Sequence, residues 1–99
     1  MQRDIFPRVN DAACSCLPAI LDRWLPDGVK EGGEWVALNP TRADAKRGSF
    51  KVNLRTGRWA DFATGDRGGD PVSLAAYLFN LKQHEAAKHM ATMLGISDD

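Results

Sequence analysis

The chain has 99 residues, of which 43% are hydrophobic and 26% are charged, a composition typical of a folded globular domain rather than a disordered one. Thirteen basic residues balance thirteen acidic ones, and this formal net charge of zero argues against a protein that holds nucleic acid by bulk charge alone. No apolar run approaches the roughly 20 residues that a membrane-spanning helix needs, so no membrane partner is expected. The two cysteines, Cys14 and Cys16, are too close in sequence for an easy structural disulfide, which favours a reduced, cytoplasmic setting.

The first predicted element is a helix over about 10–24. Asn10 or Asp11 can cap it. Its apolar residues recur three and four positions apart, and Pro18 inside it is expected to kink or restart the helix. Short strands are expected next at 29–30 and 34–38. A polar loop follows at 39–48, and its length is typical of loops that are mobile or functional.

A β-hairpin is predicted over 49–63. Phe50, Val52 and Leu54 alternate with polar residues, which is the period of a strand with one buried face. Gly57 suits the turn because glycine takes a positive φ without steric cost. The second strand carries Trp59 and Phe62 and is followed by the run 65–69, which is too rich in glycine for regular structure.

Two helices are predicted after the sheet, at about 70–81 and 84–94. Asp70 is a typical N-cap, Pro71 suits the first helical position, and Gly95 suits the end of the second helix. The expected fold is a single α+β domain over 1–99, in which one helix precedes a small antiparallel sheet at 29–63 and two helices follow it. We expect its core between sheet and helices to contain Val36, Leu38, Phe50, Val52, Leu54, Val72 and Phe79.

Basic residues concentrate in the middle of the chain. Between Pro40 and Asp70, seven lysines and arginines stand against four aspartates, so this segment is net basic. Cations interleaved with aromatic residues are typical of surfaces that bind single-stranded nucleic acid. The pattern leaves open whether Trp59 is a stacking platform or a core residue. The candidate contact residues are Arg42, Lys46, Arg47, Lys51, Arg55, Arg58, Trp59 and Arg67.

The cysteines, the histidines and the glycine run 65–69 are each better explained by an ordinary structural role than by a functional site. On a helix the thiols of Cys14 and Cys16 diverge, as do His84 and His89, so neither pair indicates a metal site. The glycine run 65–69 before a helix could cradle a phosphate, but it lacks the lysine of a P-loop and carries acidic residues, which favours a structural turn. No catalytic set is visible, so the domain is predicted not to be an enzyme.

Four segments match one known pattern in their order and spacing: Asn39-Pro40, Ser49–Val52, Gly68-Gly69-Asp70 and Leu81–Ala87. Together they make residues 24–95 resemble the N-terminal zinc-binding domain of bacterial and phage DNA primases. In that family these segments are a Cys-Pro strand end, a Ser-Phe strand, the start of a helix, and the break before a second helix.

The metal ligands of that family are missing from this chain. Asn39 replaces the first cysteine, and loop 40–48 lacks the histidine of the family's loop. Asp61 and Thr64 fall near the positions of the Cys-x-x-Cys pair that ends the family's aromatic strand. Structural zinc needs four cysteine or histidine ligands. The resemblance therefore implies a zinc-ribbon-like fold without metal or other cofactor.

The resemblance also implies a function and partners. It points to a DNA-binding module of a phage or mobile-element replication protein, which binds single-stranded DNA as template through the basic β-hairpin, beside a Toprim, primase or helicase domain. The alternative is a protein-interaction module on a degenerate zinc-ribbon scaffold that does not bind nucleic acid.

Overall fold

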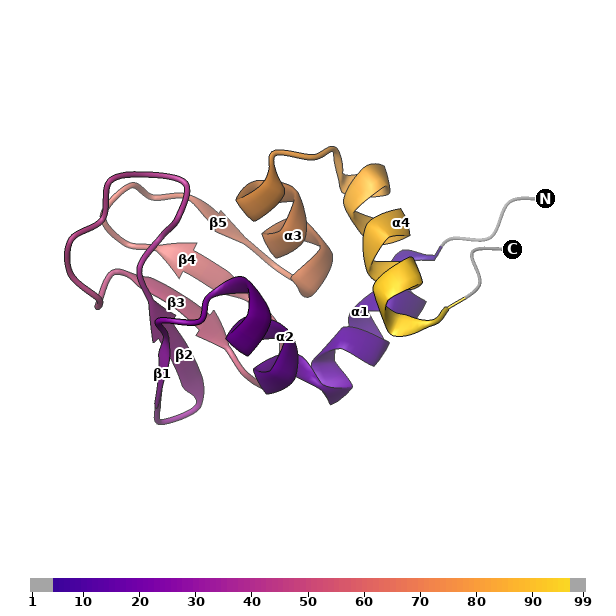
Figure 1. Ribbon diagram of the computed structural model, residues 1–99, viewed down its shortest axis with the longest axis horizontal. Helices are drawn as coiled ribbons and strands as arrows, with labels where there is room; N and C mark the ends of the chain where they lie inside the picture. The colour runs from indigo at the N-terminus through magenta and orange to yellow at the C-terminus, as the bar shows by residue number, and fades with distance from the viewer. Residues whose placement is uncertain (1–4, 97–99) are drawn as a thin grey trace.

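The computed structural model describes residues 5–96, and within them four helices and five strands form an elongated molecule (Figure 1). In chain order the elements are α1 (Phe6–Ser15), α2 (Leu17–Trp24), β1 (Val29–Glu31), β2 (Glu34–Ala37), β3 (Phe50–Asn53), β4 (Trp59–Asp61), β5 (Arg67–Gly68), α3 (Pro71–Phe79) and α4 (Gln83–Leu94). The predicted α+β class with an antiparallel sheet is confirmed.

The five strands form a simple antiparallel meander in the order β1-β2-β3-β4-β5. Val52 pairs with Trp35 on one side and with Trp59 on the other, so these three side chains share one face of the sheet. Lys51 and Arg67 lie on the opposite face, because both are in register with the same residue of β4. The alternation predicted for the hairpin is therefore present.

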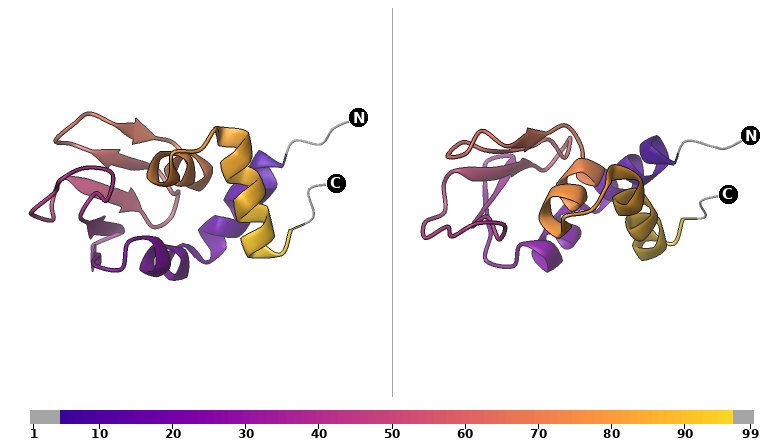
Figure 2. Two further views of the ribbon diagram at one scale, coloured as in Figure 1. Left: turned by 45° about the horizontal axis from the view of Figure 1, so that its top comes forward. Right: turned by 90° about the horizontal axis from the view of Figure 1, so that it is seen from above.

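Helices α2 and α3 cover one face of the sheet, and the other face is left without a helix (Figure 2). One core cluster lies between that covered face and the two helices, where Leu17 and Leu21 of α2 and Leu74 of α3 meet the strands. A second cluster joins α1, α3 and α4 through residues such as Val9, Ala75 and Met90. Helix α3 thus has two apolar sides, and it connects the sheet to the terminal helices.

The helix predicted at 10–24 is two helices, α1 and α2, that break at Cys16, which agrees with the restart expected at Pro18. Pro18 lies in the first turn of α2, where it has no N–H to donate and its ring would clash with a continuous preceding helix. The start also differs from the predicted cap. Helix α1 begins at Phe6, and Asn10 lies inside it, where its Oδ1 accepts a hydrogen bond from the backbone N–H of Val72 at 3.0 Å.

The sheet continues beyond the predicted limit of 63. Arg67 and Gly68 form β5, although the run 65–69 was expected to lack regular structure. Glycine is needed at 68, because a Cβ there would come within 2.4 Å of both Ser73 Oγ and the indole nitrogen of Trp59. The short edge strand is therefore possible because glycine permits this close approach.

The predicted core is partly wrong. Leu38 and Leu54 are only half-buried, and Phe79 is 51% exposed, since Leu38 follows the end of β2 and Phe79 ends α3 on its solvent side. Trp35 and Trp59 fill the space between sheet and helices instead. Phe50, Val52 and Val72 belong to the core clusters as predicted, whereas Val36 is buried on the opposite face of the sheet, in register with Lys51.

The predicted helix ends agree closely with the structure. Asp70 is the N-cap of α3 and Gly95, with a φ of 73°, follows the last turn of α4. Gly57 has a φ of 78°, as the hairpin turn requires. Within residues 5–96, none of the helices has the length and apolar character to cross a membrane.

Candidate nucleic-acid interface

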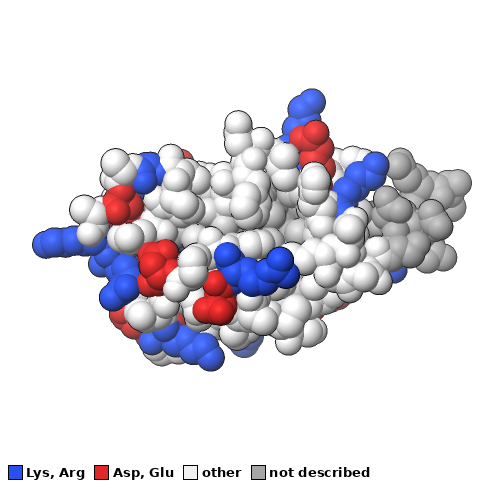
Figure 3. Space-filling view, in the orientation of Figure 1, with Lys and Arg blue, Asp and Glu red and all other residues white. Residues whose placement is uncertain are grey.

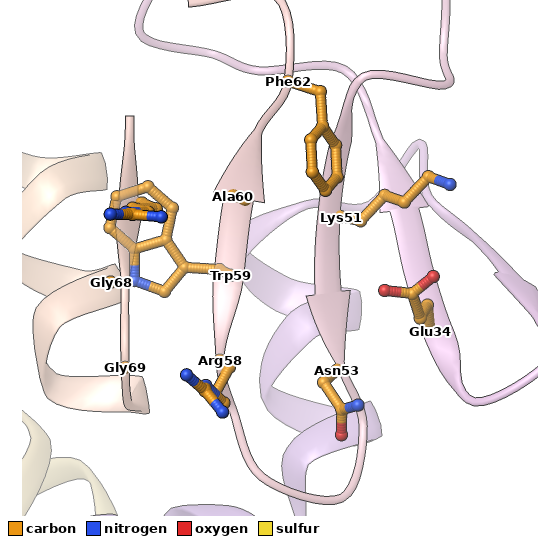
Figure 4. Close-up of a pocket in the computed structure, with 10 residues that line it drawn as sticks. Glu34, Lys51, Asn53, Arg58, Trp59, Ala60, Phe62, Gly68 and Gly69 are labelled. Atoms are coloured by element: carbon orange, nitrogen blue, oxygen red, sulfur yellow. The ribbon is translucent and has the colours of Figure 1, made fainter. Parts of the chain in front are cut away.

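A groove of about 680 Å³ lies on the uncovered face of the sheet, across β3, β4 and β5 (Figure 4). Its charged lining consists of Lys51, Arg58, Arg67 and one acid, Glu34. Lys51 and Arg67 stand on either side of Ala60 in one row across the strands. With neighbouring strands about 4.8 Å apart, the backbones at these two cations are about 10 Å apart. The small Ala60 side chain leaves open space between them.

The three cations of this groove are available to a ligand. Within residues 5–96 no ion pair or hydrogen bond engages the side chain of Lys51, Arg58 or Arg67, apart from the contact of Lys51 with an aromatic ring. A phosphate could therefore bind without displacing an existing partner. Three cations and one acid make the groove net positive in a chain with no net charge.

Phe62 supplies an exposed aromatic ring at the same groove. It is 72% exposed, and the Nζ of Lys51 lies 6.0 Å from the centre of its ring. Figure 4 shows the ring beside Lys51, on the open side of the strands. An exposed aromatic face next to cations is the arrangement on which unpaired bases stack.

Phe62 was not among the predicted site residues, although the sequence held a signal for it. Trp59 and Phe62 are three positions apart on one strand, so a period of two places them on opposite faces. Since one face of the strand is buried, this spacing predicts that one of the two aromatic residues lies on the open face. The backbone N–H of Phe62 donates to the carbonyl of Ser49 at 2.8 Å, so the strand pairing and its alternation of faces continue as far as Phe62.

Trp59 belongs to the core, and this corrects its place among the candidate contact residues. It is 6% exposed, and its ring centre lies 4.5 Å from that of Tyr77. Its Nε1 donates a hydrogen bond to Ser73 Oγ at 2.9 Å, and Gly68 packs directly against its indole. Although Trp59 lines the groove, only 6% of it is exposed, so the ring has no free face on which a base could stack.

Arg42 is also engaged, in a partly buried ion pair. Its Nε donates to Asp61 Oδ2 at 2.7 Å, one terminal nitrogen donates to Ser49 Oγ at 3.0 Å, and the same nitrogen lies 3.4 Å from a carboxylate oxygen of Asp44. The Asp61 side chain is fully buried. Arg42 therefore neutralises a buried carboxylate and is not free for a phosphate, which removes it from the predicted contacts.

Asp61 is the centre of a polar cluster, the Asp61 cluster, formed with Asn39, Arg42 and Tyr77. Asn39 Nδ2 donates to Asp61 Oδ2 at 2.8 Å and to the Tyr77 hydroxyl at 2.9 Å. The hydrogen bond from Arg42, with help from Asn39 and the backbone N–H of Ala63, holds the pKa of Asp61 well below its usual range, although burial opposes this. The cluster fixes the loop after β2 to β4 and α3.

The other predicted cations lie outside the groove. Arg47 donates to the backbone carbonyl of Asp27 at 2.9 Å, and Lys46 is exposed in the same loop. Arg55 is exposed in the turn between β3 and β4. On the face seen in Figure 3, basic and acidic side chains alternate around the sheet end of the molecule. Of the predicted set, the groove thus brings together Lys51, Arg58 and Arg67.

The glycine run 65–69 does not form a phosphate site. At the start of α3, Asp70 Oδ1 accepts the backbone N–H of Ser73 at 2.8 Å, and Ser73 Oγ lies 3.3 Å from the backbone nitrogen of Asp70. This capping box occupies the donors that an anion would use. Among residues 5–96, no three His, Cys, Asp or Glu side chains are placed to hold a metal ion.

No protein-family model matches this chain, and no curated protein matches its sequence. The groove, its three cations and Phe62 are therefore the observations from which a function can be argued.

Proposed function

We propose that the chain is a non-catalytic module that binds single-stranded DNA in the groove on the uncovered face of its sheet. The observation that carries this proposal is the exposed Phe62 ring beside Lys51, with Arg58 and Arg67 lining the same groove. A base stacks on Phe62, and the neighbouring phosphates contact the cations.

The groove favours a single strand over a duplex. The face of a base is free to stack on a side chain only when the base has left the duplex stack. Phosphate contacts release counterions, and each contributes about 0.7 to the slope of log affinity against log salt for a single strand. With Lys51, Arg58 and Arg67 in contact, the slope is about 2, so a fourfold rise in salt should weaken binding about 16-fold.

The Asp61 cluster supports the resemblance to the primase zinc-binding domain. That resemblance aligns Asn39, Asp61 and Thr64 with ligand positions, which must converge in space. Asn39 and Asp61 are joined by a hydrogen bond of 2.8 Å, and Thr64 Oγ1 lies 3.5 Å from the backbone carbonyl of Asp61. In this proposal a hydrogen-bonded ion pair takes the place of the metal, and the module serves a cytoplasmic replication protein with a Toprim, primase or helicase domain.

The alternative function, a protein-interaction module, is favoured by a second surface. An apolar groove of about 350 Å³ lies between α2, α3 and α4, and the half-exposed Phe79 is part of its lining with Trp24 and Met93. The described residues that line this groove include no lysine or arginine, so the two functions predict binding at different ends of the molecule.

Fluorescence anisotropy with a labelled single-stranded oligonucleotide, measured from low to moderate salt, tests the proposal. We expect affinity to fall with salt, and the double variant Arg58→Ala with Arg67→Ala to lower the slope by about 1.4. The matched control removes two exposed cations outside the groove, Lys46→Ala with Arg55→Ala, and should leave the slope nearly unchanged. No binding by the folded wild type at any salt concentration would reject the proposal in favour of the interaction module.

A further inference from the structure

Glu34 is the one acid in the lining of the basic groove. It opens β2, pairs in register with Asn53 of β3, and is half-buried. Within residues 5–96 no hydrogen bond or ion pair engages its carboxylate. Figure 4 shows Glu34 between Lys51 and Asn53 at the side of the groove. A carboxylate here weakens the attraction for phosphate, and its free oxygens are available as hydrogen-bond acceptors.

Asn53 places a hydrogen-bond donor next to that acceptor. Its Oδ1 accepts the backbone N–H groups of Arg55 at 2.9 Å and of Thr56 at 3.0 Å, which fixes the orientation of the amide. The Nδ2 group is therefore left as the free part of the side chain, and Asn53 lines the groove. Side chains directly opposite on neighbouring antiparallel strands have Cβ atoms about 5 Å apart. Acceptor and donor are thus close enough to contact one base.

We propose that Glu34 and Asn53 read the edge of an unpaired base and make the groove prefer cytosine over thymine. This inference rests on the proposed binding of single-stranded DNA in the same groove. The 4-amino group of cytosine donates to a carboxylate, and its ring N3 accepts from the Asn53 amide. Thymine in that position presents a carbonyl oxygen to Glu34 and an N–H to Asn53, so both contacts become repulsive.

Two oligonucleotides of equal length, oligo(dC) and oligo(dT), test the preference because both bases are pyrimidines of similar size. Anisotropy is measured at mildly alkaline pH, where cytosine is unprotonated. We expect oligo(dC) to bind at least about fivefold more tightly, because fivefold is what one of the two hydrogen bonds alone provides. In Glu34→Gln the side chain can both donate and accept, so the ratio should fall towards one while the affinity for oligo(dT) rises.

The matched control is Asp22→Asn, which removes the same charge from an exposed acid of α2, on the other side of the sheet and outside the groove. It should keep the wild-type preference, and thermal melts verify that both variants fold. Equal binding of the two oligonucleotides by the wild type would overturn the inference and leave the proposed function standing. A preference that persists in Glu34→Gln would overturn the role of Glu34. Failure of both oligonucleotides to bind would reject the proposed function, and this inference with it.

Discussion

Replacing Phe62 by alanine tests whether the exposed ring is the stacking residue. The ring is 72% exposed, and the contact with Lys51 at 6.0 Å is its one described aromatic or cation interaction. A cation–π contact at an exposed site contributes about 0.5–1 kcal/mol, so the variant should remain folded with a nearly unchanged melting temperature. Loss of a stacked base costs about 1–3 kcal/mol of binding free energy, which weakens affinity by about 5- to 150-fold.

The measurement is anisotropy with a labelled single-stranded oligonucleotide at one low salt concentration, beside thermal melts of each protein. Phe62→Tyr retains an aromatic face and should bind like the wild type. Trp59→Ala should lower the stability of the fold, whereas Phe62→Ala should lower only the affinity for DNA. The reason is that Trp59→Ala removes a core ring that is 6% exposed, together with its hydrogen bond to Ser73. It should lower the free energy of unfolding by about 3–5 kcal/mol. A folded Phe62→Ala variant with wild-type affinity would refute the stacking argument.

Three further predictions concern the fold. Because Arg42 holds the pKa of Asp61 below its usual range, their ion pair stabilises the fold fully above the ordinary carboxyl pKa of about 4, and this stability is lost as pH falls towards the lowered pKa. Thermal melts in acid should therefore show a weaker pH dependence of the melting temperature in Asp61→Asn than in the wild type. Asp61→Ala should lower the free energy of unfolding at neutral pH by about 3–5 kcal/mol. An Asp61→Ala protein as stable as the wild type would contradict the role of the cluster. Asp70→Ala removes one side of the capping box of α3 and should cost about 1 kcal/mol by chemical denaturation without weakening DNA binding. Unchanged stability of this variant would contradict the role of Asp70 as the N-cap. A strong chelator should leave the melting temperature unchanged, and a drop would indicate a structural metal.

The local features of this fold could be predicted from the sequence. The alternation of Phe50 and Val52 with polar neighbours placed Lys51 on the open face, and Asp70 with Pro71 marked the start of α3. Each of these rests on neighbouring residues, whose spacing and capping chemistry are visible in the sequence.

The features that were missed depend on residues distant in sequence. Arg42 was counted as a phosphate contact because nothing near it shows that Asp61 is its partner, 19 positions away. The role of Trp59 depends on Ser73 and on the glycine at 68, which lets the indole pack beneath β5. The number of basic residues in the segment could not show which of them line the groove. Lys51 and Arg67 lie on the same face because of the register of β3, β4 and β5, which depends on pairing between strands.

The most direct test of the central claim is a titration of the isotopically labelled protein with single-stranded oligonucleotide, observed through its backbone amide NMR signals. The account predicts that the largest shifts fall on Lys51, Ala60, Phe62 and Arg67, which lie on the uncovered face of β3 to β5. Signals from the apolar groove around Phe79 should stay in place. Shifts confined to α3 and α4, or no shifts at all in the folded protein, would contradict a DNA-binding groove on this sheet.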